Sequence, residues 1–194
     1  LNKNFPDLTC YFRVEKTQQC LELLHSGKID AALLAFPLPK HNANSQIKDF
    51  KLYFEQFYLA CNKNHQLIKN NIKNIDNDCI KKQKLMLLEE GHCLRDQSID
   101  ICNLIDNNNK LISQFQATCL ESLRAIIATD PSHASIMPKY ACNTYPNIKY
   151  IPIKANKVGR NIHLCFRASD PRTKLMGSLS DYIISIEKSI NNMF

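Results

Sequence analysis

The sequence lacks several features that would assign it to a compartment or a cofactor class. It has no apolar run near the roughly 20 residues of a membrane-spanning helix, and no basic-then-apolar secretory leader. It has no Cys-x-x-Cys pair, which weakens a structural zinc site. Its lysines are not interleaved with aromatic residues in the manner used to stack nucleic-acid bases. We therefore expect a cytoplasmic protein that binds no membrane and needs no cofactor.

Cysteine, in contrast, is abundant, with nine residues in a chain of 194. A secreted disulfide framework would be expected in a shorter chain with an even number of cysteines, so mostly free thiols in a reducing compartment fit better. A metal site could still assemble from scattered side chains, namely Cys20, His25, Cys61 and His65, but we expect no metal.

The overall composition indicates a globular fold, because 44% of the residues are hydrophobic and 22% are charged. The length suits one ordinary domain or two small lobes. The net charge is +7, but the lysines are dispersed with modest clusters at 69–73 and 81–84, so we interpret them as solvated surface. The first residue is Leu1 rather than Met, and we expect a fragment of a longer protein or a trimmed form.

Two cysteines, Cys93 and Cys102, lie nine positions apart in a segment entered through Gly91 and His92. Only a thiolate attacks a peroxide, and a nearby cation favours it; His92 and Arg95 could supply that charge to Cys93. A sulfenic acid formed on Cys93 would condense with a second thiol, and Cys102 is the local candidate.

The reach between these thiols depends on secondary structure, since residues 96–104 are predicted to be helical. Nine helical steps separate two Cα atoms by about 13 Å, whereas a disulfide needs about 7 Å or less. Bond formation would require local refolding, and the short loop contributes about 3 kcal/mol in the chain-entropy model. The alternative is that both cysteines are buried, inert thiols.

The pattern of apolar residues predicts alternating strands and helices, and hence an α/β fold with parallel sheets. A strand at 8–14, a helix at 18–25 capped by Thr17 and ended by Gly27, and a strand at 29–36 form a predicted βαβ unit. Thr118 and Glu121 fit a capping box for a helix reaching residue 127. Residues 37–49 are predicted to be a loop. Further strands are predicted at 50–61, 84–88, 112–117, 135–137, 148–153 and 162–166, and a final helix at 171–190.

Four blocks of sequence resemble the OxyR group of peroxide-responsive LysR-type transcription regulators. The first is Gly-His-Cys-Leu-Arg-Asp-Gln at 91–97, which is similar to the sensing segment of that group. The others, in the same order as in the family, are Ser-Gly-Lys-Ile-Asp at 26–30, Phe-Gln-Ala-Thr-Cys-Leu-Glu-Ser-Leu-Arg at 115–124, and the strand at 163–170 that contains an arginine. Met137-Pro138 matches a further apolar-Pro step.

The resemblance implies a two-lobed fold like that of periplasmic binding proteins, with lobe I at 1–60 plus 166–194 and lobe II at 61–165. It implies that hydrogen peroxide oxidises Cys93 and that Cys102 resolves it as a disulfide. Thr17, in a Glu-x-Thr context, would help to hold the peroxide. Arg167 would support the sensing pocket, and His92, Arg95 and Asp96 belong to the sensing motif.

Each of these roles has a simpler structural alternative. Thr17 could serve only as a helix cap, Asp96 could cap the following helix, Arg167 could form an ion pair between lobes, and His92 could point outwards. Compared with the family, the chain lacks the N-terminal helix-turn-helix and the first strand of lobe I. We therefore expect lobe I to be truncated and expect DNA binding only through the absent segment.

The expected function is redox control of antioxidant gene transcription, with a homodimer here, a tetramer in the full-length form and a cellular thiol as reductant. We do not expect an enzyme, although a thiol peroxidase is an alternative. Two further alternatives are a LysR-type domain that binds a small organic effector and a non-functional truncated remnant.

Overall fold

The structure is a computed structural model that describes residues 4–36, 46–102, 112–154 and 158–191. Most of the loop predicted at 37–49, and the end of the helix predicted at 96–104, lie outside these ranges. The elements in chain order are α1 (Thr17–His25), β1 (Ala31–Phe36), β2 (Ile47–Asn62), α2 (Gln66–Lys69), α3 (Asn77–Ile80), β3 (Lys84–Leu88), α4 (Cys93–Cys102), β4 (Ile112–Ala117), α5 (Leu120–Thr129), β5 (His133–Pro138), a 3-10 turn (Lys139–Ala141), β6 (Ile148–Pro152), β7 (Gly159–Arg167) and α6 (Thr173–Asn191).

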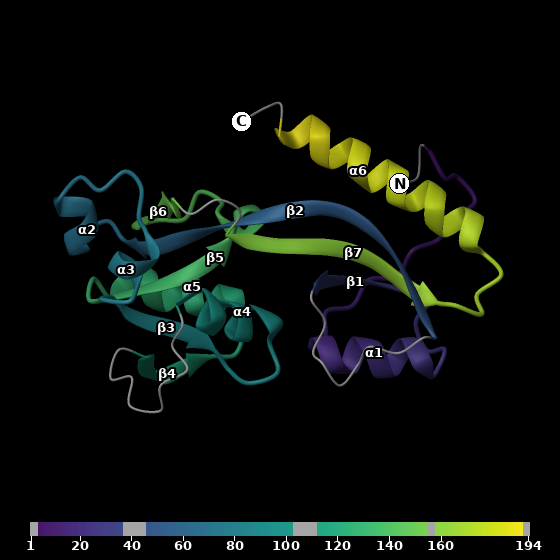
Figure 1. Cartoon of the computed structure of the whole chain (residues 1–194), viewed down its shortest axis with the longest axis horizontal. Helices are drawn as coiled ribbons and strands as arrows, with labels where there is room; N and C mark the ends of the chain where they lie inside the picture. The colour runs from purple at the N-terminus through teal and green to yellow at the C-terminus, as the bar shows by residue number, and fades with distance from the viewer. Residues whose placement is uncertain (1–3, 37–45, 103–111, 155–157, 192–194) are drawn as a thin grey trace.

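A long strand, β2, joins the two halves of the molecule (Figure 1). Its residues 47–56 pair antiparallel with β7, and its residues 57–62 pair antiparallel with β5 and β6. The strand order is β1-β7-β2-β5-β3-β4, with β6 also paired to β2. We call β1, β7, the start of β2, α1 and α6 the first half, and the remaining elements the second half. Residues 159–165 of β7, which were predicted to lie in lobe II, pair with strands of the first half.

The first half is a three-stranded sheet with α1 on one face and α6 on the other (Figure 1). Leu21 and Leu24 of α1 are buried against Leu34 and Cys165, whereas Met176 of α6 belongs to a separate cluster on the opposite face. Each helix buries one apolar stripe, so the sheet between them is covered on both faces.

The backbone at the end of α1 explains why the helix ends at the predicted position, Gly27. Gly27 has a φ of +72°, and its N–H donates to the Leu24 carbonyl while that of Lys28 donates to the Leu23 carbonyl. These are the two bonds of a Schellman motif, which requires a left-handed residue. The predicted stop at Gly27 is confirmed.

The second half contains the larger apolar core. The strand β3 runs parallel to both β4 and β5, as expected for an α/β arrangement. Leu123 and Ile127 of α5 are fully buried against this sheet, together with Phe57 and Ile136 from its strands. In the described residues, no helix is both long enough and apolar enough to cross a membrane.

Several sequence expectations are wrong in detail. Residues 8–14 do not form a strand, and Tyr11, Phe12 and Val14 are 93%, 82% and 97% exposed. A strand requires a hydrogen-bonded neighbour, which local β-propensity cannot supply. The predicted βαβ unit is therefore absent, and β1 instead pairs antiparallel with β7. The sheet is mixed rather than parallel throughout.

Helix starts were also misplaced. Lys16 occupies the N-cap of α1, and Thr17 is its first helical residue. The N-cap of α5 is Cys119 rather than Thr118, and the Cys119 N–H donates to Ser122 Oγ at 3.2 Å. The helix predicted from Asp96 begins earlier, at residue 93. Local capping patterns locate a helix start only to within a few residues.

Candidate functional site

The helix α4 places one cysteine at each of its ends. It begins at Cys93, after a turn in which Gly91 has a φ of +89°, and it ends at Cys102. The ten-residue helical backbone separates the two Cα atoms by about 13 Å. The backbone of Cys102 lies in the helix, but its side chain is outside what the structure describes. A bond between these cysteines would require α4 to unwind.

A cavity of about 150 Å³ lies beside Cys93 and is built from segments far apart in the chain. The segment that precedes and opens α1, the strand β1 and the strand β7 all contribute to it. Its lining residues are Glu15, Thr17, Cys20, Leu33, Leu34, Ala35, Cys93, Arg160 and Ile162. The cavity therefore brings a residue of the second half, Cys93, against the first half. Cys93 also packs on the apolar cluster under α6.

Arg160 is the cation that reaches the Cys93 thiol. Its Nη1 lies 4.0 Å from Cys93 Sγ, and its Nε donates to Glu55 Oε2 at 2.8 Å. Glu55 is only 4% exposed and also accepts a hydrogen bond from the Tyr140 N–H at 3.2 Å. The guanidinium is thus held in place by a buried carboxylate and directed at the sulfur. A guanidinium and a helix N-terminus both favour a thiolate.

The predicted cations of the sensing motif have other contacts. Arg95 Nη1 donates to the Leu88 carbonyl at 3.1 Å, so it stabilises the strand before the helix. His92 Nε2 is buried without a hydrogen bond and lies 3.9 Å from Glu89 Oε1. Neither residue is among those that line the cavity. Sequence adjacency to Cys93 therefore did not identify the arginine that meets it.

Thr17 and Asp96, two other predicted site residues, differ in whether they line the cavity. Thr17 is 8% exposed and lines the cavity with Cys93, so the structure brings these two together. Burial raises the pKa of Asp96, opposed by Arg95, and nearby Asp100 raises it further. Asp96 lies in the first turn of α4, where a carboxylate favours a helix N-terminus.

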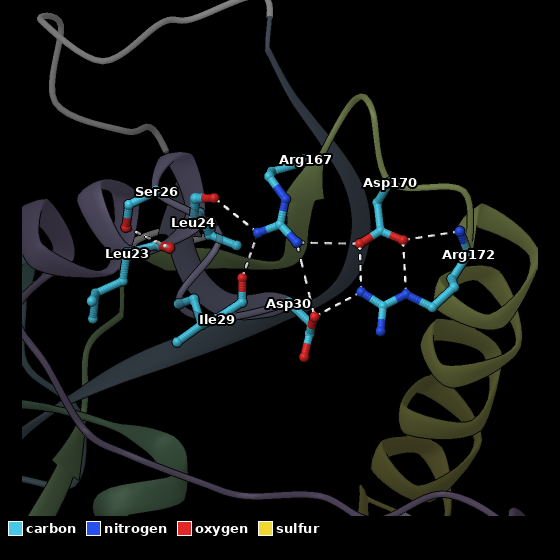
Figure 2. Close-up of polar contacts among 8 residues, drawn as sticks. All are labelled: Leu23, Leu24, Ser26, Ile29, Asp30, Arg167, Asp170 and Arg172. Atoms are coloured by element: carbon cyan, nitrogen blue, oxygen red, sulfur yellow. Dashed lines mark hydrogen bonds and ion pairs between the residues drawn. The ribbon is translucent and has the colours of Figure 1, made fainter.

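Arg167 belongs to a different network, which Figure 2 shows. Its Nη1 donates to the carbonyls of Leu24 and Ile29 at 2.9 and 2.5 Å, and its Nη2 lies 3.4 Å from Asp170 Oδ2. Arg167 therefore ties the end of α1 to the turn before α6 rather than lining the cavity. The Arg172 guanidinium and backbone N–H bind Asp170 and lower its pKa to about 2.

Sequence reasoning missed Arg160 and the position of Cys20. Arg160 is the second residue of β7, after Gly159, and the available signal was a charged residue near the start of an apolar strand. Cys20 was considered only as a metal candidate, with His25, Cys61 and His65. In the described part of the chain no three His, Cys, Asp or Glu side chains are grouped as a metal site would need.

Comparison with known proteins finds similarity across nearly the whole chain. The family model of the LysR substrate binding domain matches residues 1–185. A hydrogen peroxide-inducible genes activator from Haemophilus influenzae is 31% identical over 193 residues, covering 96% of this chain and 61% of the relative. The DNA-binding transcriptional dual regulator OxyR of Escherichia coli K12 is 28% identical over 186 residues, covering 94% of this chain and 58% of the relative. The chain spans about three fifths of the length of these curated relatives.

Solved structures show the same relationship. The reduced form of OxyR superposes with a TM-score of 0.80 at 29% identity, covering 95% of this chain and 84% of that chain. The oxidised form of OxyR has a TM-score of 0.77 at the same identity and coverage. The expected fold class is therefore confirmed as a mixed α/β fold with a curled sheet, of the periplasmic-binding-protein-like type.

Proposed function

This chain belongs to the family of LysR substrate-binding domains, and we propose that it is the peroxide-sensing part of an OxyR-like transcription regulator. The observation that carries the proposal is the placement of Cys93. Its thiol opens a helix, faces a small cavity and lies 4.0 Å from a guanidinium that a buried carboxylate holds. The Haemophilus influenzae relative is a hydrogen peroxide-inducible genes activator, in agreement with this chemistry.

The chemistry proceeds in two steps. The Cys93 thiolate attacks one oxygen of hydrogen peroxide, the O–O bond breaks, and a sulfenic acid and hydroxide form. Arg160 would be the cation beside the sulfur during the attack, and Thr17, which lines the cavity, would help to hold the peroxide. The Cys102 thiol then displaces the sulfenic oxygen as water and forms a disulfide with Cys93.

The second step converts oxidation into a change of shape, because α4 must unwind. Leu94 and Ser98 anchor the helix, with exposures of 4% and 2%, and Ser98 Oγ donates to the Leu94 carbonyl at 2.6 Å. Exposing one buried leucine costs about 2 kcal/mol, and closing a short disulfide loop contributes about 3 kcal/mol. These magnitudes are comparable, so the reduced and oxidised forms can both be populated.

The cavity volume favours a peroxide over an organic effector. Sites for small organic ligands usually enclose about 300–1,000 Å³, whereas this cavity holds about 150 Å³. A molecule of the size of hydrogen peroxide needs little more room than water, whose share of liquid volume is about 30 Å³. We therefore prefer redox sensing to effector binding.

The proposal extends to the partners and location of the protein. We propose a cytoplasmic regulator that is not an enzyme, that dimerises and that is re-reduced by a cellular thiol. DNA would be contacted by a helix-turn-helix that is not among these 194 residues, and the targets would be antioxidant genes. The change in α4 would act by altering how the domains pack in the assembly.

Peptide mapping after brief treatment with low-micromolar hydrogen peroxide tests the proposal. Trypsin separates Cys93 and Cys102 into the peptides 85–95 and 96–110, so a bridge between them appears as one linked pair. We expect a loss of two hydrogens and this linked pair. Cys79→Ser is the matched control and should oxidise like the wild type. Normal oxidation and switching in a Cys93→Ser variant would refute the proposal.

A further inference from the structure

A second thiol, Cys20, faces the cavity that contains Cys93. It lies in the first turn of α1 and is partly buried against the cluster of Leu21 and Leu24. Burial raises the pKa of the Cys20 thiol, Glu15 raises it further, Arg13 lowers it, and charge on Cys93 raises it again. Cys20 and Cys93 line the same cavity of about 150 Å³, which is the geometric relation between the two thiols.

Lys16 holds the beginnings of α1 and α4 together. Its Nζ donates to the Glu90 carbonyl at 3.0 Å and lies 2.7 Å from Glu89 Oε1, in the turn before Cys93. Its own carbonyl accepts the N–H of Cys20 at 3.0 Å. One residue therefore connects the backbone of Cys20 to the turn that leads into Cys93, and the two helix starts cannot separate without breaking these contacts.

The cysteine expected to resolve Cys93 is placed less favourably. Cys102 ends α4 and is separated from Cys93 by the whole length of the helix. Its approach requires α4 to unwind, whereas Cys20 already lines the same cavity as Cys93.

We propose that Cys20 is an alternative resolving thiol that forms a Cys20–Cys93 disulfide across the cavity. The inference rests on the proposed function, since it needs the sulfenic acid that peroxide makes on Cys93. The Cys20 sulfur attacks the Cys93 sulfur, the S–O bond breaks, and the hydroxyl leaves with the thiol proton as water. The peroxide is the oxidant, and two thiols become one disulfide.

The two disulfides would have different structural consequences. A Cys93–Cys102 bond requires α4 to unwind, but a Cys20–Cys93 bond leaves α4 helical and ties it to α1. The second bond would therefore lock the two halves of the molecule together at the cavity. The oxidised protein would have two forms, of which one keeps the arrangement of the reduced state.

The test uses the full 194-residue chain carrying Cys102→Ser, treated with equimolar hydrogen peroxide and then blocked with N-ethylmaleimide. Trypsin places Cys20 alone in the peptide 17–28 and Cys93 alone in the peptide 85–95. We expect these two peptides to be linked within a monomer. Adding Cys79→Ser should change nothing, and adding Cys20→Ser should abolish the link.

A second variant tests the contacts that Lys16 makes with the turn before Cys93. Lys16→Met retains the length of the side chain and removes its contacts with Glu89 and Glu90, so it should slow formation of the Cys20–Cys93 link several-fold. Mapping in the presence of Cys102 should show a larger share of the Cys93–Cys102 link, because both thiols compete for the same sulfenic acid.

The outcomes separate this inference from the proposed function. Trapping of a Cys93 sulfenic acid by dimedone in Cys102→Ser, without a link to Cys20, overturns the inference and leaves peroxide sensing intact. A link found only between two molecules also overturns it. An absence of any oxidation at Cys93 in the wild type would remove the proposed function, and the inference with it.

Discussion

Removing the charge of Arg160 should change both the stability of the protein and the reactivity of Cys93. Arg160→Met keeps a long, unbranched side chain but leaves Glu55, which is 4% exposed, without its cation. Glu55→Gln removes the opposite charge and retains an oxygen for the Tyr140 N–H. The double variant removes both charges at once. Comparing these three variants isolates the ion pair from the packing of the side chains.

The expected stability loss follows from the burial of the pair. Removing one partner of a buried ion pair costs about 3–5 kcal/mol, and the 16% exposure of the Arg160 side chain indicates the lower end. For a chain of this size, about 3 kcal/mol corresponds to a decrease of roughly 6–12 °C in Tm. In the double variant no charge is left unpaired, so we expect it to be less destabilised than the sum of the single variants by about 2 kcal/mol.

Arg160→Met and Glu55→Gln should change the reactivity of Cys93 in opposite directions. At 4.0 Å a guanidinium and a thiolate attract each other by about 4 kcal/mol at an effective dielectric constant of 20, and the Glu55 carboxylate offsets part of this. Loss of this attraction in Arg160→Met should slow alkylation of Cys93, and each 1.4 kcal/mol lost corresponds to about a tenfold decrease in rate. Glu55→Gln should accelerate it, because the opposing charge is gone.

Urea denaturation under reducing conditions and iodoacetamide alkylation rates measure the two effects. Additive stability losses within about 0.5 kcal/mol would show that the pair is not coupled. Equal alkylation rates in the two single variants would refute the argument that Arg160 acts on the thiolate.

Three further substitutions test the surrounding framework. Gly159→Ala should destabilise the chain by about 3 kcal/mol or more in urea denaturation, because its Cβ would overlap the Glu55 carbonyl and lie 2.6 Å from a ring atom of Phe54. Gly91→Ala should cost about 1–2 kcal/mol, since its φ is +89° and its Cβ would lie 3.0 Å from Lys16 Cδ; an unchanged urea midpoint would contradict this. The pKa of Asp170 is depressed to about 2 from 3.8, so its ionised form stabilises the fold above about pH 4, and that contribution disappears as the pH falls towards 2. Asp170→Asn should lower stability at pH 7 by on the order of 1 kcal/mol and reduce the loss of Tm between pH 4 and pH 2; an unaltered acid profile would count against this network.

Local patterns predicted the individual elements more reliably than their arrangement. The start and end of β3 at 84–88 and of β4 at 112–117 agree with prediction, because short apolar runs bounded by polar residues identify buried strands. The segment 8–14 has the composition of a strand but no strand beside it, so its aromatic side chains are exposed. Pairing depends on distant segments, and local propensity does not specify them.

The candidate site shows the same division between local and distant information. The motif around Cys93 was enough to propose Cys93 as the reactive cysteine and Cys102 as its partner, because spacing and neighbouring charges are properties of adjacent residues. The sequence suggested Arg167 for the pocket, whereas the arginine at the thiol is Arg160, near the other end of β7.

The sequence by itself determined the family, and it predicted a helix close to Cys93 and the pairing of Cys93 with Cys102. Tertiary structure alone decided which groups meet Cys93. Arg160 is 67 residues away along the chain, and Cys20 approaches from α1; both arrive because β7 and β1 pair beside β2 and because Lys16 joins α1 to the turn before α4. Contacts of this kind depend on the register of strands and the packing of helices, which only the whole chain specifies.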